Sequence, residues 1–198
     1  MPLRYPTLSL EDIILPRALR VLCTALLFCG LSAWGATDRP VTIDTWTNHP
    51  GIKEVRAIYN EIESGIKQKK YRTTVRRFDI HSPLCATYPV KSETLTVDSQ
   101  NRPRLYRLEQ LGSHGEPFTV GRYYDAKGSL RFVYVDRSVS SLRIYLNGDG
   151  DVFWAVEKNA DKFTAFDSKS GDWETKPRRA DGAREAFQER QLCPEIKK

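Results

Sequence analysis

Arginine and aromatic side chains alternate along one stretch of the chain, Pro117 to Lys158, and are the residues best suited to chemistry. The stretch reads as two successive β-hairpins, and side chains in a strand alternate between the two faces of a sheet. In the expected register Arg122 lies directly opposite Arg131, and aromatic residues share their face. Paired guanidinium groups suit carboxylate or phosphate, and arginine beside aromatic rings is enriched at binding surfaces. The pattern predicts a binding surface for an anionic partner, formed by Arg122, Tyr124, Arg131, Arg143, Tyr145 and Phe153.

This register has two consequences. Like charges directly opposite each other destabilise a sheet, so replacing both Arg122 and Arg131 with alanine is expected to leave the thermal midpoint unchanged or higher while weakening binding. The other face, with Tyr123, Leu130 and Ile144, is expected to be the core face. The alternative is that Glu157 or another acid neutralises the arginines and that a loop covers the aromatic rings.

Signatures of known catalytic sites are absent from the sequence. It has no glycine-rich phosphate loop and no G-x-S-x-G, H-E-x-x-H or C-x-x-C motif. Asn147-Gly-Asp-Gly-Asp151 resembles the start of a calcium loop, but the glycine at the sixth position and the glutamate at the twelfth are missing, so we interpret it as a turn. We therefore expect a non-catalytic binding or envelope-associated module that needs no cofactor and no metal. The alternative is a small hydrolase that uses two carboxylates brought together by folding.

The N-terminal segment has the order of a secretory signal. Arg17 and Arg20 precede an apolar run, Val21 to Ala33, and small residues follow it. Because the run is shorter than the ~20 residues of a spanning helix, we expect cleavage near Gly35 rather than an uncleaved anchor. The prediction is a signal in residues 1–35, a single domain in residues 36–198, and an exported protein, periplasmic or extracellular, with no membrane span after cleavage.

The cysteines and the charge limit the partners. Cys85 and Cys193 remain after the signal, and two cysteines in an exported chain most simply form a disulfide. A metal site would need further ligands, and only His81 stands near Cys85. The net charge of +6 permits an anionic envelope component as partner, and no nucleic acid is expected.

Periodicity and turn residues predict the fold. Apolar residues recur at helical spacing from Ile52 to Ile66, with Asn48 as a plausible N-cap, and a short helix is expected at Ala183–Leu192. Asp125–Gly128 and Asn147–Asp151 are predicted to close hairpins, with weaker hairpin units around them. The fold class is α+β, an antiparallel β-meander of about six to eight strands with an N-terminal amphipathic helix and a short C-terminal helix. A half-closed β-barrel is the alternative.

Two basic segments stand outside this candidate surface. Lys67, Lys69 and Lys70 follow the first helix, where positive charge complements the helix dipole, and an anion site is the alternative. Lys176-Pro-Arg-Arg179 forms a second basic turn near the C-terminus.

Overall fold

The computed structural model describes residues 41–85, 89–112, 114–166, 175–189 and 193–196. All of them belong to one unit, Pro40–Lys198. The predicted signal, residues 1–35, lies outside the described residues, as does Leu192 of the predicted terminal helix. The division into 1–35 and 36–198 therefore stays a prediction.

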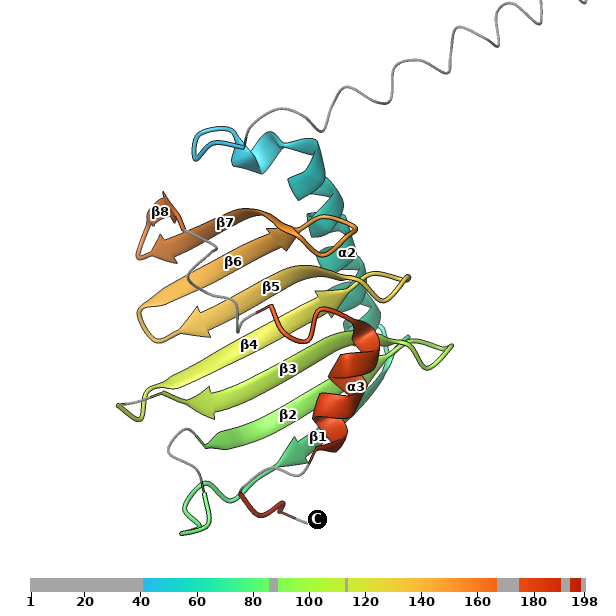
Figure 1. Ribbon diagram of the computed structural model, residues 1–198, viewed down its shortest axis with the longest axis vertical. Coiled ribbons are helices and arrows are strands. Elements are labelled where there is room, and N and C mark those ends of the chain that lie inside the picture. The colour runs from blue at the N-terminus through green and yellow to red at the C-terminus, as the bar shows by residue number, and fades with distance from the viewer. Residues whose placement is uncertain (1–40, 86–88, 113, 167–174, 190–192, 197–198) are drawn as a thin grey trace, which may run out of the picture. The chain divides into compact units, whose positions relative to one another are not determined.

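An antiparallel sheet of eight strands forms the body of the unit, and each strand pairs with its neighbours in the chain (Figure 1). The predicted meander is confirmed, and because the sheet is open the half-closed barrel is wrong. The strands are β1 (Arg72–Arg77), β2 (Val90–Val97), β3 (Pro103–Leu111), β4 (Pro117–Tyr124), β5 (Leu130–Arg137), β6 (Ser140–Leu146), β7 (Val152–Asn159) and β8 (Lys162–Ala165).

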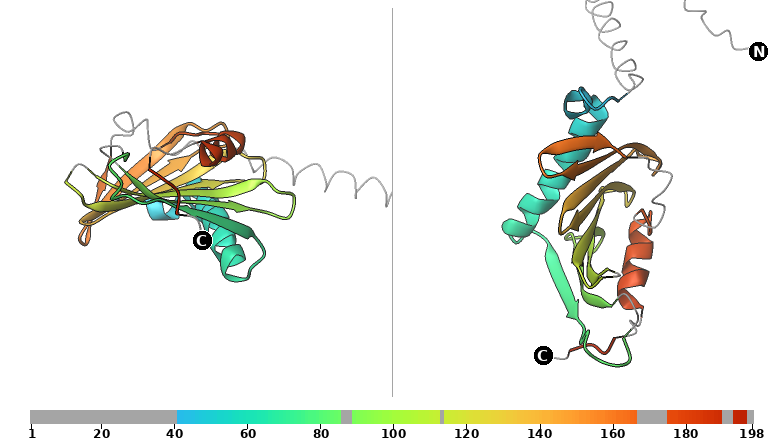
Figure 2. Two further views of the ribbon diagram at one scale, coloured as in Figure 1. Left: turned by 90° about the horizontal axis from the view of Figure 1, so that it is seen from below. Right: turned by 90° about the vertical axis from the view of Figure 1, so that its left-hand side faces the viewer.

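Two α-helices lie on opposite faces of this sheet (Figure 2). The first is α2 (Pro50–Lys67), which follows a short 3-10 turn, η1 (Trp46–Asn48), and the second is α3 (Ala180–Gln188). The N-cap of α2 is His49 rather than Asn48, because Asn48 belongs to the turn that buries Trp46 against Tyr145. Both predicted helices are confirmed, with shifted ends.

Both faces of the sheet are hydrophobic cores, so the prediction of one core face and one mixed face is wrong. On the α2 side, Ile52, Val55 and Ile62 of the helix pack against an aromatic cluster that includes Tyr123 and Phe132. On the α3 side, the buried residues are mostly aliphatic, and they include Leu130, Val133, Leu142, Ile144, Ala180 and Ala183. A sheet buried on both faces leaves little room for an open binding face on its central strands.

Three turns at one end of the sheet share the same geometry. Each begins with Asp98, Asp125 or Asn147, whose side-chain oxygen accepts hydrogen bonds from the backbone N–H groups two and four residues later. The fourth residue has a positive φ in every case: Asn101 at 62°, Gly128 at 80° and Gly150 at 88°. Asparagine and glycine adopt this conformation more readily than other residues, which is why the predicted turn chemistry holds.

Each turn is followed by a β-bulge on its second strand. The pairing jumps from Leu105 to Pro103, from Phe132 to Leu130 and from Trp154 to Val152. The extra residues are therefore Arg104, Arg131 and Phe153. A bulge of this kind shifts the register by one residue and redirects a side chain.

The predicted pairing of Arg122 with Arg131 is wrong for this reason. Arg122 lies opposite Val133, because the turn pairs Tyr124 with Leu130 and the bulge then shifts the register again. In the second hairpin the predicted turn Asn147–Asp151 places Leu146 opposite Val152, and the bulge then places Tyr145 opposite Trp154.

The disulfide between Cys85 and Cys193 is confirmed. It holds the C-terminal segment at the end of β1, where Phe78 forms a β-bridge with Glu195. Arg76 of β1 adds to this attachment, because its guanidinium donates to the carbonyl of Phe187 and, at 3.1 Å, to that of Glu189. Such bonds satisfy carbonyl groups that the end of α3 leaves without helical partners.

Removing this disulfide should destabilise the fold. The bridged cysteines are 108 residues apart in sequence, for which the chain-entropy model gives about 4–5 kcal/mol, and about 2–4 kcal/mol is typical in practice. We expect the double variant Cys85→Ser/Cys193→Ser to unfold several degrees earlier than the wild type in a thermal melt. A reductant should lower the midpoint of the wild type and leave that of the variant unchanged. A variant as stable as the wild type would contradict the assignment.

Candidate functional site

The six residues predicted to form one binding surface lie in three different places. Arg122 and Tyr124 are on the α3 side of the sheet, and Arg131 occupies a bulge. The other three, Arg143, Tyr145 and Phe153, are on the α2 side. Arg122 lies opposite Val133, and Val133 opposite Ile144, so the pairing of β5 with β6 places Arg143 on the other face from Arg122.

Arg122 and Tyr124 belong to the interior. Arg122 is 3% exposed, and its guanidinium lies 5.8 Å from the centre of the Tyr106 ring. Tyr124 is fully buried, and its hydroxyl donates to the carbonyl of Pro177 at 2.8 Å. Both side chains therefore contact the protein's own core and the segment that leads into α3.

Arg131 connects its hairpin to α2. Its Nε donates to the carbonyl of Leu146 at 3.2 Å, and its Nη2 lies 2.9 Å from Glu54 of α2. Its Nη1 lies 3.4 Å from Asp125, the first residue of its own turn. The guanidinium is engaged on all three nitrogens within the protein.

Arg104 repeats this arrangement one hairpin earlier. Its Nε donates to the carbonyl of Tyr124 at 3.1 Å, its Nη2 lies 3.1 Å from Glu61 of α2, and its Nη1 lies 3.9 Å from Asp98. We call Arg104 and Arg131 the bulge arginines. Phe153, at the third bulge, lies beside the start of α2, with its ring centre 6.0 Å from that of His49. The three bulge residues therefore attach α2 to three successive hairpins.

A cleft of about 410 Å³ lies between α2 and strands β5 and β6. We call it the α2–sheet cleft. Two residues of the predicted surface, Arg143 and Tyr145, line it. The full lining is Val55, Arg56, Tyr59, Asn60, Phe132, Tyr134, Arg143 and Tyr145. Its polar groups are thus two guanidinium groups, three phenol hydroxyls and one amide.

Aromatic rings support both arginines of the cleft. The guanidinium of Arg56 lies 4.8 Å from the centre of the Trp46 ring, and that of Arg143 lies 5.5 Å from the Phe163 ring. These two rings contact each other with centres 5.7 Å apart. Arg56 also donates a hydrogen bond to the carbonyl of Thr47 at 3.2 Å. Cation–π contacts fix the position of a guanidinium without neutralising its charge.

The arginines of the cleft differ from the ion-paired arginines elsewhere in the unit. Arg76, Arg102, Arg104, Arg107, Arg131 and Arg137 each have a carboxylate within 4.0 Å. Within the described residues, neither Arg56 nor Arg143 has one. The α2–sheet cleft is therefore a place where two positive charges face a cavity without a counter-charge from the described residues.

Two tyrosines of the cleft, Tyr59 and Tyr145, are hydrogen-bond donors at neutral pH. Burial, followed by the nearby carboxylate of Glu63, raises the pKa of Tyr59. Burial also raises the pKa of Tyr145, against the opposing effect of Arg56. Since an unperturbed tyrosine has a pKa of about 10, both hydroxyls keep their protons throughout the physiological range.

The sequence analysis did not single out Arg56, Tyr59 or Tyr134, which line the cleft. The available signal was the spacing of Arg56, Tyr59 and Asn60 at i, i+3 and i+4, which places them on one side of a helix at the border of its apolar stripe.

Compared with known proteins, the chain matches no family model, no curated protein and no solved structure. In the part of the chain that the structure describes, no helix combines the length and apolar composition needed to cross a membrane. The same residues contain no group of three or more His, Cys, Asp or Glu side chains that could hold a metal ion. The function therefore has to be inferred from the geometry of the site.

The bulge arginines should be essential to stability. Arg131→Met keeps much of the side-chain bulk but removes the donor to the Leu146 carbonyl and the ion pairs with Asp125 and Glu54. We therefore expect a loss on the order of 2 kcal/mol in the free energy of unfolding. Arg122→Ala/Arg131→Ala should likewise unfold at a lower temperature, the opposite of what the sequence suggested. Chemical denaturation measures the stability of both variants.

Arg137→Met is the control. Its ion pair with Glu157 spans 3.6 Å at a partly exposed site, so a loss of at most about 1 kcal/mol in the free energy of unfolding is expected. Equal losses for Arg131→Met and Arg137→Met would show that the bulge contacts add nothing.

Proposed function

We propose that this protein is a binding module whose α2–sheet cleft takes a small anionic ligand, a carboxylate attached to a ring or another flat apolar group. The observation that supports this function is the pair Arg56 and Arg143, which face one cavity with no carboxylate from the described residues within salt-bridge distance. Guanidinium groups bind carboxylates through directed, charge-assisted hydrogen bonds.

The energetics favour an anion from outside the protein. A partly buried charge is costly unless water or a counter-charge compensates it. Arg104 and Arg131 obtain that compensation from acids of α2, whereas the two arginines of the cleft have no such partner among the described residues. In the cleft the aromatic rings of Trp46 and Phe163 hold the guanidinium groups in place before any ligand arrives. Such preorganisation lowers the entropy lost on binding.

The remaining lining favours an organic anion over a bare ion. The volume lies within the range of roughly 300–1,000 Å³ typical of small-molecule sites. Phe132 and the tyrosines supply apolar surface, and the amide of Asn60 and the Tyr59 hydroxyl supply directional contacts. Beside the cleft, Trp154 lies opposite Tyr145, and its buried indole N–H has no hydrogen-bond partner among the described residues. It is a further donor next to the site.

We further propose that the module works in the periplasm or outside the cell, where its partner is an anionic component of the envelope. Disulfides persist in oxidising compartments, and the Cys85–Cys193 bridge is consistent with such a location. The alternative of a hydrolase with two carboxylates gains no support from this cleft, because no Asp or Glu is among its lining residues.

Binding of a simple aromatic carboxylate tests the function. We expect benzoate to perturb the NMR signals of the cleft residues, and its neutral isostere benzamide to bind more weakly. Arg143→Met removes the charge and keeps the apolar stem, so it should weaken benzoate binding about tenfold or more, as for loss of a charge-assisted hydrogen bond. Arg137→Met, on β5 but outside the cleft, should bind benzoate like the wild type.

The thermal midpoint of Arg143→Met should stay within a few degrees of the wild type, because a cation–π contact contributes about 0.5–1 kcal/mol at an exposed site. Equal affinity for benzoate and benzamide, or full benzoate binding by a folded Arg143→Met variant, would falsify the proposal.

Binding should be independent of pH between 6 and 9. Arginine stays protonated at every relevant pH, and the raised pKa values of Tyr59 and Tyr145 keep their hydroxyls neutral and able to donate. The lining contains no histidine or carboxylate that titrates in this window. Affinity for benzoate should fall only when the ligand itself is protonated, near a carboxylic acid pKa of about 4. Titrations at several pH values measure this, and a step in affinity near pH 6–7 would indicate a histidine in the site.

A further inference from the structure

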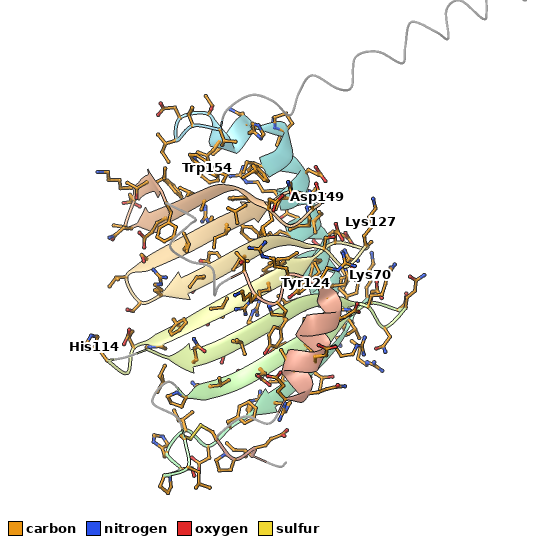
Figure 3. All side chains as sticks on the ribbon, viewed as in Figure 1. Lys70, His114, Tyr124, Lys127, Asp149 and Trp154 are labelled. Atoms are coloured by element: carbon orange, nitrogen blue, oxygen red, sulfur yellow. A yellow bond between two sulfur atoms is a disulfide. The ribbon has the colours of Figure 1, made fainter. Side chains whose placement is uncertain are left out.

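The two basic segments that the cleft does not use meet at one end of the sheet. Lys69, Lys70 and Arg72 follow α2 and line a shallow recess of about 520 Å³ with the β2–β3 turn. Arg179 precedes α3 and lines a second recess, of about 150 Å³, with Arg102, Lys127 and Arg184. In Figure 3, Lys70 and Lys127 lie at the same end of the strands, and His114 lies at the other. We call these seven basic residues the basic patch.

Asn101 joins the two recesses, since it lines both of them. Its side-chain oxygen accepts a hydrogen bond from Arg72 at 2.8 Å, and its carbonyl accepts one from Arg184. The positive φ of Asn101 places it at the tip of the β2–β3 turn, between these two arginines. The patch is therefore continuous across segments more than 100 residues apart in sequence.

Most of the positive charge of the patch is not neutralised. Arg72 and Arg184 bond to neutral groups of Asn101, and Arg179 bonds to the Ser129 hydroxyl at 3.4 Å. The two recesses contain only two acids, Asp98 and Asp181.

Both acids already have local partners. The carboxylate of Asp98 accepts hydrogen bonds from the backbone N–H groups of Gln100 and Arg102. Its Oδ2 also lies 2.8 Å from Nη2 of Arg102. Burial alone would raise its pKa, but these hydrogen bonds outweigh burial and hold the pKa below its ordinary value. Asp181 lies in the first turn of α3, where it complements the helix dipole. The acidic turn Asn147–Asp151 lies at the same end of the sheet and bounds the patch.

The arrangement of the basic patch favours a partner that presents its negative charges on a broad surface. The cations come from four separate segments, and they surround two recesses instead of following one groove. None of the large exposed hydrophobic residues, which are Ile43, Val75, Leu84, Val139 and Ile196, comes from these segments. Tyr71 lines one recess, but its hydroxyl bonds Glu61 and its ring lies 5.7 Å from the Arg104 guanidinium, so one engaged ring is all the aromatic surface that these recesses offer for stacking bases.

We infer that the basic patch docks the protein on an anionic phospholipid surface by electrostatic contact alone. Lysine and arginine near such a surface each contribute to binding, and the contributions fall off within a Debye length. This inference is independent of the ligand of the α2–sheet cleft, because no residue lines both sites.

Co-sedimentation of the full-length protein with vesicles tests the inference. The wild type should sediment with vesicles of equal parts phosphatidylglycerol and phosphatidylcholine, and not with phosphatidylcholine alone. The variant Lys69→Glu/Lys70→Glu/Lys127→Glu should lose affinity by about tenfold or more. The matched control Lys53→Glu/Lys91→Glu/Lys162→Glu changes the net charge equally at exposed positions outside the patch, and it should lose much less.

Several results would overturn the inference. They are a wild type that does not bind anionic vesicles, an equal loss in both triple variants, and binding that persists in 0.5 M salt. Binding of soluble heparin without binding of vesicles would identify a polymer, not a membrane, as the partner. Thermal melts check that each variant is folded, and the single variants Lys70→Glu and Lys127→Glu replace the triple variant if it is not.

Discussion

The attachment of α2 through residues at successive β-bulges is the constraint on which the structure depends. Arg104 and Arg131 each bind a backbone carbonyl of the next hairpin, the acid that opens their own turn, and a glutamate of α2. Glu54 and Glu61 are seven residues apart, a rise of about 10.5 Å along the helix. The bulge arginines are two strands apart, which corresponds to about 9.6 Å across the sheet. Because these distances match, α2 can cross the strands and engage every second one.

The same arrangement accounts for the location of the cleft. The bulge contacts fix α2 near the turn end of the strands, while the aromatic cluster around Tyr123 and Phe132 fills the space beneath the helix. Nearer the start of α2, Arg56 of the helix and Arg143 of β6 line the α2–sheet cleft from its two sides. The ring of Trp46 supports Arg56, and the ring of Phe163 supports Arg143. Acids on α2 are directed to the bulge arginines and to Arg107, so within the described residues none reaches the pair in the cleft.

Local use of acids also shapes the charge of the turn end. Asp98 and Asp125 accept hydrogen bonds from their own turns and lie near the bulge arginines. Carboxylates held in this way do not neutralise Lys127 or Arg179 nearby. A sequence whose net charge is only modestly positive therefore presents a concentrated positive surface at one end of the sheet.

The sequence alone determined the class and order of the elements. Periodic apolar residues from Ile52 to Ile66 specified α2, Asx and glycine residues at fixed spacing specified the turns, and the two cysteines outside the predicted signal specified one bridge. These signals are local or, for the cysteines, allow only one pair.

Tertiary structure decided which residues meet. The bulge at Arg131 leaves no mark in the sequence, yet it takes that residue out of the pairing. The β5–β6 register separates Arg122 from Arg143, because Ile144 lies opposite Val133, the partner of Arg122, while Arg143 lies opposite Tyr134. Arg56 joined Arg143 only because α2 packs across β5 and β6, a contact between segments nearly ninety residues apart that no local pattern encodes.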